Sequence, residues 1–328
     1  MSYRYVIHAR DAGFFANFNG VINRLGSTVC QDDIAVVNWQ ANQVVRDGTV
    51  VAQTQFPYGT PADGNLWNQF FEPLPFIPNR TARYQTRDIW QIDHCGMCFD
   101  TFRAWGKRAC RLYTLNNQHW RQKYHAIYNR YVRPRAYIKE RVDSFCGKYL
   151  NQPECVGVHI RHAGHSVEQI NKYVYGVPHF VAAIRQQYGQ RVPTIFLATD
   201  QEDVIQEMRD EFGAAVVFQE NVQRVVGGDA EQLHFDRKGA VELGADILSD
   251  ALLLASCKRL IHVTSNVVSA VGFINPQIEM RYTGHFEPAA KLFWSRTHQI
   301  CFRGRSLRRL VRWSRGREVD LHLLPTAP

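Results

Sequence analysis

The chain has 328 residues, of which 45% are hydrophobic and 21% are charged. This composition excludes a disordered or fibrous protein, and the length is typical of two domains that each bury their own core. No apolar run reaches the roughly 18 residues of a transmembrane helix, and the first residues, MSYRYVIHAR, lack the pattern of a secretory signal. We therefore expect a cytoplasmic protein.

The eight cysteines are scattered along the chain. Without an export signal, we expect them to stay reduced as buried thiols. Cys95 and Cys98, with His94 and Cys110 nearby, leave a structural zinc site as an alternative. The second ligand pair that zinc sites usually show is missing, so buried thiols are the preferred interpretation.

The formal net charge is +9, which indicates anionic partners. Seven arginines lie within 303–317, interleaved with leucine, valine and tryptophan. Two interpretations stay open: a helix that contacts anionic lipid at the cytoplasmic face of a membrane, or a C-terminal helix with a solvated arginine face. Nucleic-acid binding is not expected, because no nucleic-acid-binding motif accompanies the charge.

The first half of the chain begins with a βαβ pattern. A strand is predicted over 5–9, a glycine turn follows at 11–13, a helix over 13–26 and a second strand over 34–39. This order implies a parallel sheet. Residues 42–110 show weak periodicity, and we predict loops and short helices around an open cleft. Residues 116–150 read as two helices with a break at Pro134.

The second half alternates strictly between strands and helices. Strands are predicted over 155–160, 194–199, 214–218, 259–263 and 278–282, and helices over 178–188, 201–212 and 240–256 and from 265 onward. This alternation predicts a doubly wound parallel sheet. Ligands bind such sheets at the carboxyl ends of the strands, so the polar residues there are the candidates for function.

Arg161 and His162 follow the first of these strands. An arginine fork grips phosphate oxygens and stabilises the charge that develops on a departing diphosphate. His159 lies inside the strand, where a core histidine is the preferred interpretation. Asp200 ends the next strand and either contacts a base or ribose or caps the following helix.

Asp246 and Asp250 lie four residues apart on the long helix over 240–256, so they share one face. Asp250 adjoins an apolar stretch and needs a partner, either a ligand or a neighbouring arginine. Ser265 follows a strand and looks like the cap of the last predicted helix, whose start would suit a phosphate. Thr264 and Asn266 flank it.

Three segments, in this order, resemble parts of the fucosyltransferases: VGVHIRH, LATDQEDV and GADILSDALLLASCKRLIHVTSN. The resemblance extends to the α1,6-fucosyltransferases, to the rhizobial nodulation-factor type and to the α1,2- and protein O-fucosyltransferases. It covers about 120 residues. It implies an α/β fold of two Rossmann-like lobes, of the GT-B glycosyltransferase type, with a cleft between them. It also implies an inverting enzyme that uses GDP-fucose and requires neither a cofactor nor a divalent metal.

Carried over residue by residue, the resemblance implies that Arg161 holds the β-phosphate and that His162 stands where many members have a second arginine. Asp250 would contact guanine or ribose, and Asp200 would line the donor pocket. Glu168 is a loose positional match to the catalytic base, with Asp11 and Glu220 as other candidates. The remaining predicted members are His159, Thr264, Ser265 and Asn266 for the donor, and Asp11, Gly13 and Asn17 for an acceptor or phosphate loop.

We therefore predict an acceptor lobe over 1–150, a nucleotide-sugar donor lobe over 151–283 and a basic helical tail over 284–328. The expected partners are a nucleotide sugar and a glycan acceptor. Two alternatives stay open. The enzyme could use another nucleotide sugar to build a polysaccharide, or the chain could be a non-catalytic binding protein of the same fold.

Overall fold

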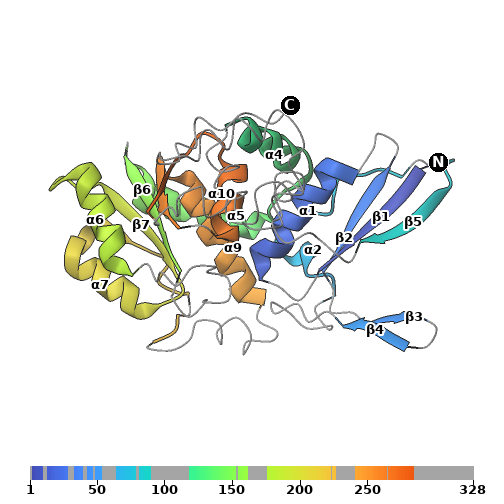
Figure 1. The fold of residues 1–328 in the computed structure, drawn as a ribbon, viewed down its shortest axis with the longest axis horizontal. Coiled ribbons are helices and arrows are strands. Elements are labelled where there is room, and N and C mark those ends of the chain that lie inside the picture. The colour runs from blue at the N-terminus through green and yellow to red at the C-terminus, as the bar shows by residue number, and fades with distance from the viewer. Residues whose placement is uncertain are drawn as a thin grey trace, which may run out of the picture.

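The structure is a computed structural model. It describes the following residues: 2–9, 13–28, 33–39, 43–46, 49–53, 64–78, 81–89, 118–152, 154–161, 176–222, 224–226, 241–263 and 265–283. These residues form a mixed α/β fold with two separate parallel sheets, as predicted. The sheets lie toward opposite ends of the long axis, and helices fill the space between them (Figure 1).

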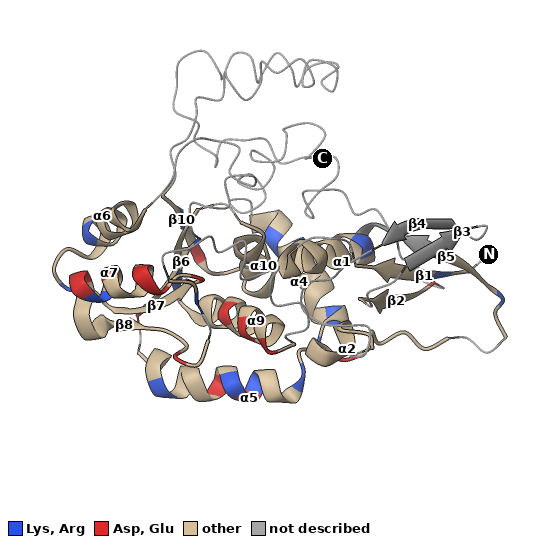
Figure 2. Cartoon of the chain, turned by 90° about the horizontal axis from the view of Figure 1, so that it is seen from below, with Lys and Arg blue, Asp and Glu red and all other residues tan. Residues whose placement is uncertain are grey.

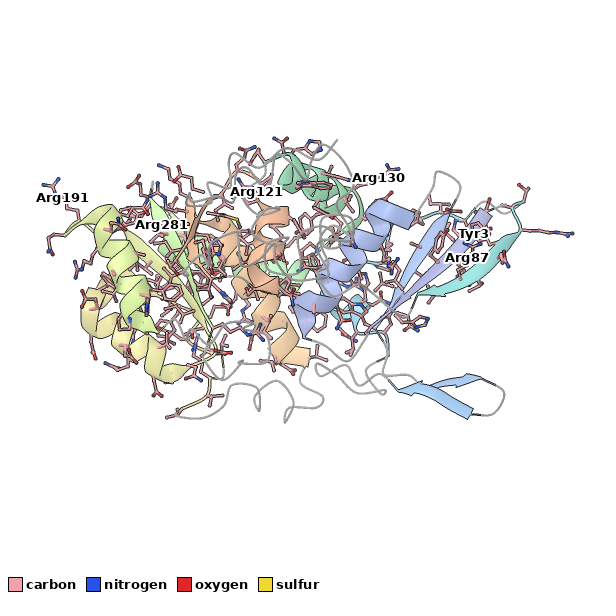
Figure 3. The ribbon with its side chains drawn as sticks, in the orientation of Figure 1. Tyr3, Arg87, Arg121, Arg130, Arg191 and Arg281 are labelled. Carbon is pink, nitrogen blue, oxygen red and sulfur yellow. The ribbon has the colours of Figure 1, made fainter. Side chains whose placement is uncertain are left out.

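The first sheet has the strand order β2-β1-β5 and is parallel throughout. The central strand β1 (Ser2–His8) is flanked by β2 (Ile34–Asn38) and β5 (Tyr84–Ile89). Across the sheet, the guanidinium carbon of Arg87 lies 3.7 Å from the centre of the Tyr3 ring (Figure 3). The expectation of loops and short helices over 42–110 is wrong for β5 and also for a hairpin of β3 (Gln43–Arg46) and β4 (Thr49–Gln53).

The helices of the first half follow the predicted apolar spacing. The helix α1 (Phe14–Thr28) buries Phe15, Phe18, Ile22 and Leu25, the residues from which it was predicted. The break predicted at Pro134 separates α4 (Gln118–Tyr131) from α5 (Ala136–Phe145). A π-helical turn, Cys146–Leu150, extends α5, and the one-turn helix α2 (Trp67–Phe70) lies against α9.

The second sheet has the strand order β10-β9-β6-β7-β8, again all parallel. The chain first builds outward from β6 to β7 and β8, then returns to the other side of β6 with β9 and β10. The order therefore reverses between β6 and β9, which is the ligand-binding position of a doubly wound sheet. The strands are β6 (Cys155–Ile160), β7 (Thr194–Thr199), β8 (Val216–Val217), β9 (Arg259–His262) and β10 (Glu279–Tyr282).

Helices cover both faces of this sheet. The helices α6 (Val177–Tyr188) and α7 (Glu202–Phe212) pack on the outer face, whereas α9 (Val241–Ser256) and α10 (Asn266–Ile274) pack on the inner face (Figure 1). Burial on both faces explains why β6 and β7 read as unbroken apolar runs. The strand predicted over 214–218 is shorter, because Gly213–Ala215 form a 3-10 turn before β8.

One hydrophobic cluster runs from the inner face of the first sheet to the inner face of the second. Its centre is aromatic: Phe14 of α1 makes edge contacts with Trp39 and Phe70, and Trp67 packs on Phe71 with ring centres 4.3 Å apart. Each fully buried aromatic contributes about 1.5–3 kcal/mol through the surface it removes from water. The helices between the sheets are therefore fixed by a shared core.

Cys146, Cys155 and Cys257 are free thiols, as expected for reduced cysteines. The residues of the zinc alternative, Cys95, Cys98 and Cys110, lie outside the described residues, as does the basic segment 303–317. Among the residues that the structure describes, no helix combines the length and apolarity that crossing a membrane requires.

Gly244 of α9 marks a close approach between α9 and α2. A Cβ atom at this position would lie 2.4 Å from Cζ of the Phe70 ring, which is fully buried and cannot move aside. Only glycine lets the helix lie at this distance from the aromatic centre.

We therefore expect Gly244→Ala to destabilise the protein. The overpacking costs about 1–3 kcal/mol, and helix propensity returns up to about 1 kcal/mol of this. The matched control is Gly147→Ala, because a Cβ there meets no atom within 4 Å. Urea unfolding should show a lower midpoint for Gly244→Ala and an equal or higher one for Gly147→Ala. A Gly244→Ala protein as stable as the parent would contradict the packing.

Candidate functional site

The carboxyl ends of β6 and β9 lie side by side at the point where the strand order reverses. His159 of β6 and His262 of β9 are direct partners in the ladder. Arg161 follows the end of β6, and Ser265 follows the end of β9. The structure thus brings together three of the residues predicted for the donor site.

Helix α10 begins at this edge, and Ser265 is its N-cap, as predicted. The Ser265 backbone is extended, and its Oγ accepts a hydrogen bond from the backbone N–H of Val268 at 3.1 Å. Ser269 Oγ donates to the Ser265 carbonyl at 3.1 Å. A helix start of this kind presents N–H groups and the positive end of the helix dipole, which suits an anion.

Helix α1 begins at the same end of the molecule as α10 (Figure 1). The Gly13 carbonyl accepts the backbone N–H groups of Ala16 and Asn17, and the Asn17 side chain is fully buried. The second turn of α1 is joined to the first turn of α10, because Asn19 Nδ2 donates to the Asn266 carbonyl at 2.9 Å. Gly13 and Asn17, predicted as a separate acceptor or phosphate loop, therefore belong to a helix whose start adjoins that of α10.

His159 is almost completely buried, and its Nδ1 has no hydrogen-bond partner within the described part of the chain. Burial, with smaller contributions from Arg161 and His262, lowers the pKa of His159 to about 3, against the opposite effect of Asp200. The imidazole is therefore neutral at pH 7. Among the described residues, Nδ1 of His159 is not satisfied as a core histidine would be, and a buried nitrogen of this kind at a strand end favours a ligand contact.

His262 was not among the predicted site residues, because it lies inside a short apolar strand. Burial lowers its pKa to about 4, while a hydrogen bond with the Val263 carbonyl, 3.1 Å from Nδ1, acts in the opposite direction. The ring is neutral at pH 7 and lies beside His159 in the sheet. Two neutral imidazoles therefore line the floor of the site.

Asp200 ends β7 and lies close enough to His159 to affect its pKa. It is not the cap of the next helix: the N-cap of α7 is Gln201, whose side chain makes no capping hydrogen bond. The segment 224–226 covers this strand end, because Val225 N–H donates to the Asp200 carbonyl and Glu202 N–H donates to the Val225 carbonyl, each at 3.0 Å. The capping interpretation is excluded, and the donor interpretation stays a prediction.

Asp250 has a side-chain partner that sequence reasoning missed. Gln219, directly after the strand β8, donates its Nε2 to Asp250 Oδ1 at 2.6 Å. Burial raises the pKa of Asp250 to about 7, while the Gln219 hydrogen bond and the nearby Arg224 lower it. Arg224 Nη2 in turn donates to the Gln219 carbonyl at 2.7 Å. These contacts hold the Asp250 side chain in place without a ligand.

Asp246, one turn earlier on α9, makes an ion pair with Arg141 of α5, with Nη1 and Oδ1 2.6 Å apart. Figure 2 shows that α9 carries only acidic charge, whereas α5 carries both signs. Asp246 therefore fixes α9 against α5. Of the two aspartates, Asp250 is the one that lies close to Gln219 and Arg224. The prediction that both share one face of the helix fits these contacts.

Of the remaining predicted residues, the structure describes only one. Glu220 is described, and it is exposed on a turn after β8. The other four, which are Asp11, His162, Glu168 and Thr264, lie outside the described residues. Gln219 and Arg224 carried one signal that could have identified them, because they are polar residues that follow a strand.

Taken together, the residues described above supply the guanidinium groups of Arg161 and Arg224, the start of α10, two neutral imidazoles and the half-buried carboxyl group of Asp250. The cationic and N–H groups suit phosphate oxygens, and the carboxyl group suits a donor such as a hydroxyl or the amide edge of a base. This combination favours a nucleoside diphosphate as ligand.

Comparison with known proteins identifies the family of the chain. The profile of the nodulation protein Z (NodZ) family matches residues 107–275, just over half of the chain. No curated protein sequence matches.

Solved structures add further matches. NodZ α-1,6-fucosyltransferase co-crystallised with GDP is 18% identical and has a TM-score of 0.53, with 84% of this chain and 94% of that chain covered. Fucosyltransferase NodZ from Bradyrhizobium is 17% identical with a TM-score of 0.51, covering 83% and 92%. POFUT1 in complex with GDP is 10% identical with a TM-score of 0.45, covering 86% and 98%. At this identity the NodZ structures establish a shared fold.

The buried histidines predict how stability depends on pH. In the unfolded chain an imidazole binds a proton near pH 6.5, whereas folded His262 does so only near 4, so the unfolding free energy falls as pH decreases between these values. We expect His262→Gln, which does not titrate, to reduce this loss by about 1.4 kcal/mol per pH unit. Urea titrations from pH 7 to about 5 measure it. Parallel pH curves for the parent and the variant would contradict the assignment.

Proposed function

Because the chain belongs to the nodulation protein Z family, we propose that it is a GDP-fucose-dependent fucosyltransferase that transfers L-fucose to a hydroxyl group of a glycan acceptor. The titles of the matching NodZ structures describe an α-1,6-fucosyltransferase with GDP and with GDP-fucose. The same fold and a fitting diphosphate site in this chain support the proposal.

The observation that carries the proposal is the order of the second sheet, in which β6, the strand before Arg161, lies beside β9, the strand before α10. Arg161 follows β6 and α10 follows β9, and the strand order of the sheet reverses between these two strands. A diphosphate at this position would meet a guanidinium and a helix N-terminus at once. Both groups favour the leaving GDP more than the intact donor, because negative charge develops on the β-phosphate as the bond to fucose breaks.

The proposed reaction is a single in-line displacement with inversion at the anomeric carbon. The acceptor oxygen forms a bond to that carbon while the bond from the carbon to the β-phosphate oxygen breaks. GDP leaves with the electron pair, and a carboxylate takes the acceptor proton. Glu168 is the candidate base.

His159 has a distinct part in this scheme. A neutral imidazole can donate one N–H to a phosphate oxygen without adding charge to the buried strand ends. Nδ1 of His159 has no hydrogen-bond partner among the described residues, which supports this role as a donor to phosphate.

The nucleoside end of the donor is proposed to lie toward α9. Asp250 accepts from Gln219 through Oδ1 alone among the contacts described. A carboxylate oriented in this way is suited to the N–H edge of guanine or to ribose hydroxyls. Asp200, at the neighbouring strand end, is the second candidate for the ribose.

We further propose that transfer needs no divalent metal. Arg161 and the starts of α1 and α10 supply positive charge where a metal would otherwise neutralise the diphosphate. Contact of 303–317 with an anionic membrane surface at the cytoplasmic face stays part of the proposal. It would place the enzyme close to a lipid-linked or membrane-associated glycan.

Calorimetry with GDP, UDP, ADP and GDP-fucose, with EDTA present, tests the donor. We expect selective, micromolar binding of GDP and GDP-fucose, because Asp250 is suited to the guanine edge and the phosphate groups do not depend on metal. A preference for UDP or ADP would discard fucose while keeping a glycosyltransferase. A folded protein that binds none of the four would overturn the proposal.

Arg161→Ala should lower kcat for fucosyl transfer about 100- to 1,000-fold, because a preorganised donor at developing charge is removed. The matched control is Arg191→Ala. Arg191 is an exposed arginine that precedes β7, so it lies at the amino-terminal ends of the strands, away from the carboxyl ends where Arg161 lies (Figure 3). Turnover with GDP-fucose and a glycan acceptor measures both. Near-normal turnover in Arg161→Ala would show that another group carries the phosphate charge.

A further inference from the structure

Asn19 makes a contact that links the two halves of the sequence. It lies on α1, is completely buried, and donates its Nδ2 to the carbonyl of Asn266 at 2.9 Å, across 247 positions of sequence. Asn266 is the first residue of α10. The hydrogen bond therefore holds the first turn of α10, and it does so from the helix that follows β1 of the first sheet.

Other contacts from the first half hold the far end of α10. His125 of α4 lies with Nδ1 2.8 Å from the Phe273 carbonyl, and Asn129 Nδ2 donates to His125 Nε2 at 2.7 Å, so His125 donates through Nδ1. Tyr124 packs its ring on Phe273 with centres 4.6 Å apart. The helix is thus held at both ends, and Asn19 acts at the end that faces the site.

The side chain at position 19 is an unusual choice for filling a core. Its Oδ1 is buried and has no hydrogen-bond partner among the described residues. Burying half of an amide without a partner is unfavourable, and leucine would fill similar space without that cost. The hydrogen bond to the Asn266 carbonyl is the contribution that asparagine makes at position 19 and that leucine could not make.

We propose that Asn19 is a positioning residue for the diphosphate subsite. It fixes the start of α10 relative to the start of α1, so that the N–H groups of both helices face one diphosphate. The inference rests on the proposed function, in which that diphosphate belongs to the sugar donor. It assigns to α1 a share in donor binding that acts through α10.

The test is Asn19→Leu, with calorimetric affinities for GDP and for guanosine. Loss of the hydrogen bond displaces the phosphate end of the site and leaves the nucleoside end, near Asp250, intact. We expect GDP to bind about tenfold more weakly, in line with the loss of one buried hydrogen bond, and guanosine to bind as in the parent. Donor KM should rise with GDP affinity.

Asn23→Leu is the matched control. Asn23 lies one turn further along α1 and accepts from the Tyr124 hydroxyl at 3.3 Å, so its contact leads to α4 instead of the start of α10. It should leave the ratio of GDP to guanosine affinity unchanged. Asn19→Ala serves as a second variant if the leucine protein does not fold, because it removes the same bond and adds no atoms.

Two results would overturn the inference while leaving the proposed function in place: unchanged GDP affinity in a folded Asn19 variant, or an equal loss for GDP and guanosine. The equal loss would mark Asn19 as purely structural. Failure of the parent protein to bind GDP would overturn the proposed function itself and the inference with it.

Discussion

The rest of the structure depends on where helix α10 begins. Its first turn follows the strand β9 and is capped by Ser265, and its packing surfaces face both halves of the sequence. On one side α10 packs against α9, which covers the inner face of the second sheet, and on the other side it contacts α1 and α4. A helix fixed from two sides presents its dipole in one direction, as electrostatic preorganisation requires.

Within the described residues of the second half, the order of strands and helices could be predicted from the sequence, for a physical reason. Strands buried on both faces are mostly apolar, so β6 and β7 stand out as apolar runs despite His159 within β6, and their bounds match the prediction. Gly189 and Gly213 end the helices before β7 and β8 with positive φ, a conformation that glycine adopts without strain. Polar residues in such a background occur where a strand ends, as Arg161 does after β6, and Ser265 after β9 is the N-cap of α10 as predicted.

The first half was harder to predict because β5, the third strand of its parallel sheet, shows no apolar pattern. The strand β5, with the sequence YQTRDI, lies at the edge of its sheet, and Gln85 and Arg87 are exposed. This strand buries little, so period-two hydrophobicity does not develop in it, whereas β2 at the other edge of the sheet buries Ile34, Ala35 and Val37 and was predicted. Pairing with β1, which is a property of the fold, decides that the residues of β5 form a strand.

The side-chain contacts of the site were beyond sequence reasoning for a different reason. Gln219 and Asp250 are 31 residues apart, and Asn19 and Asn266 are 247 apart. Each residue alone is an ordinary polar position in a loop or helix. Only the packing of α9 and α10 on the inner face of the sheet brings the partners within hydrogen-bonding distance.

The protonation states of the buried groups determine how much charge the site holds at pH 7. His159 and His262 are neutral at pH 7, and burial raises the pKa of Asp250 to about 7. Buried charge is thereby kept small in the region where the strand ends meet, which limits the desolvation cost of folding. Positive charge enters through Arg161 and the helix starts, groups that keep their charge or dipole at every physiological pH. An anion arriving at this edge therefore meets fixed positive groups in a low-charge setting, and its interaction with each is stronger than it would be among competing buried charges.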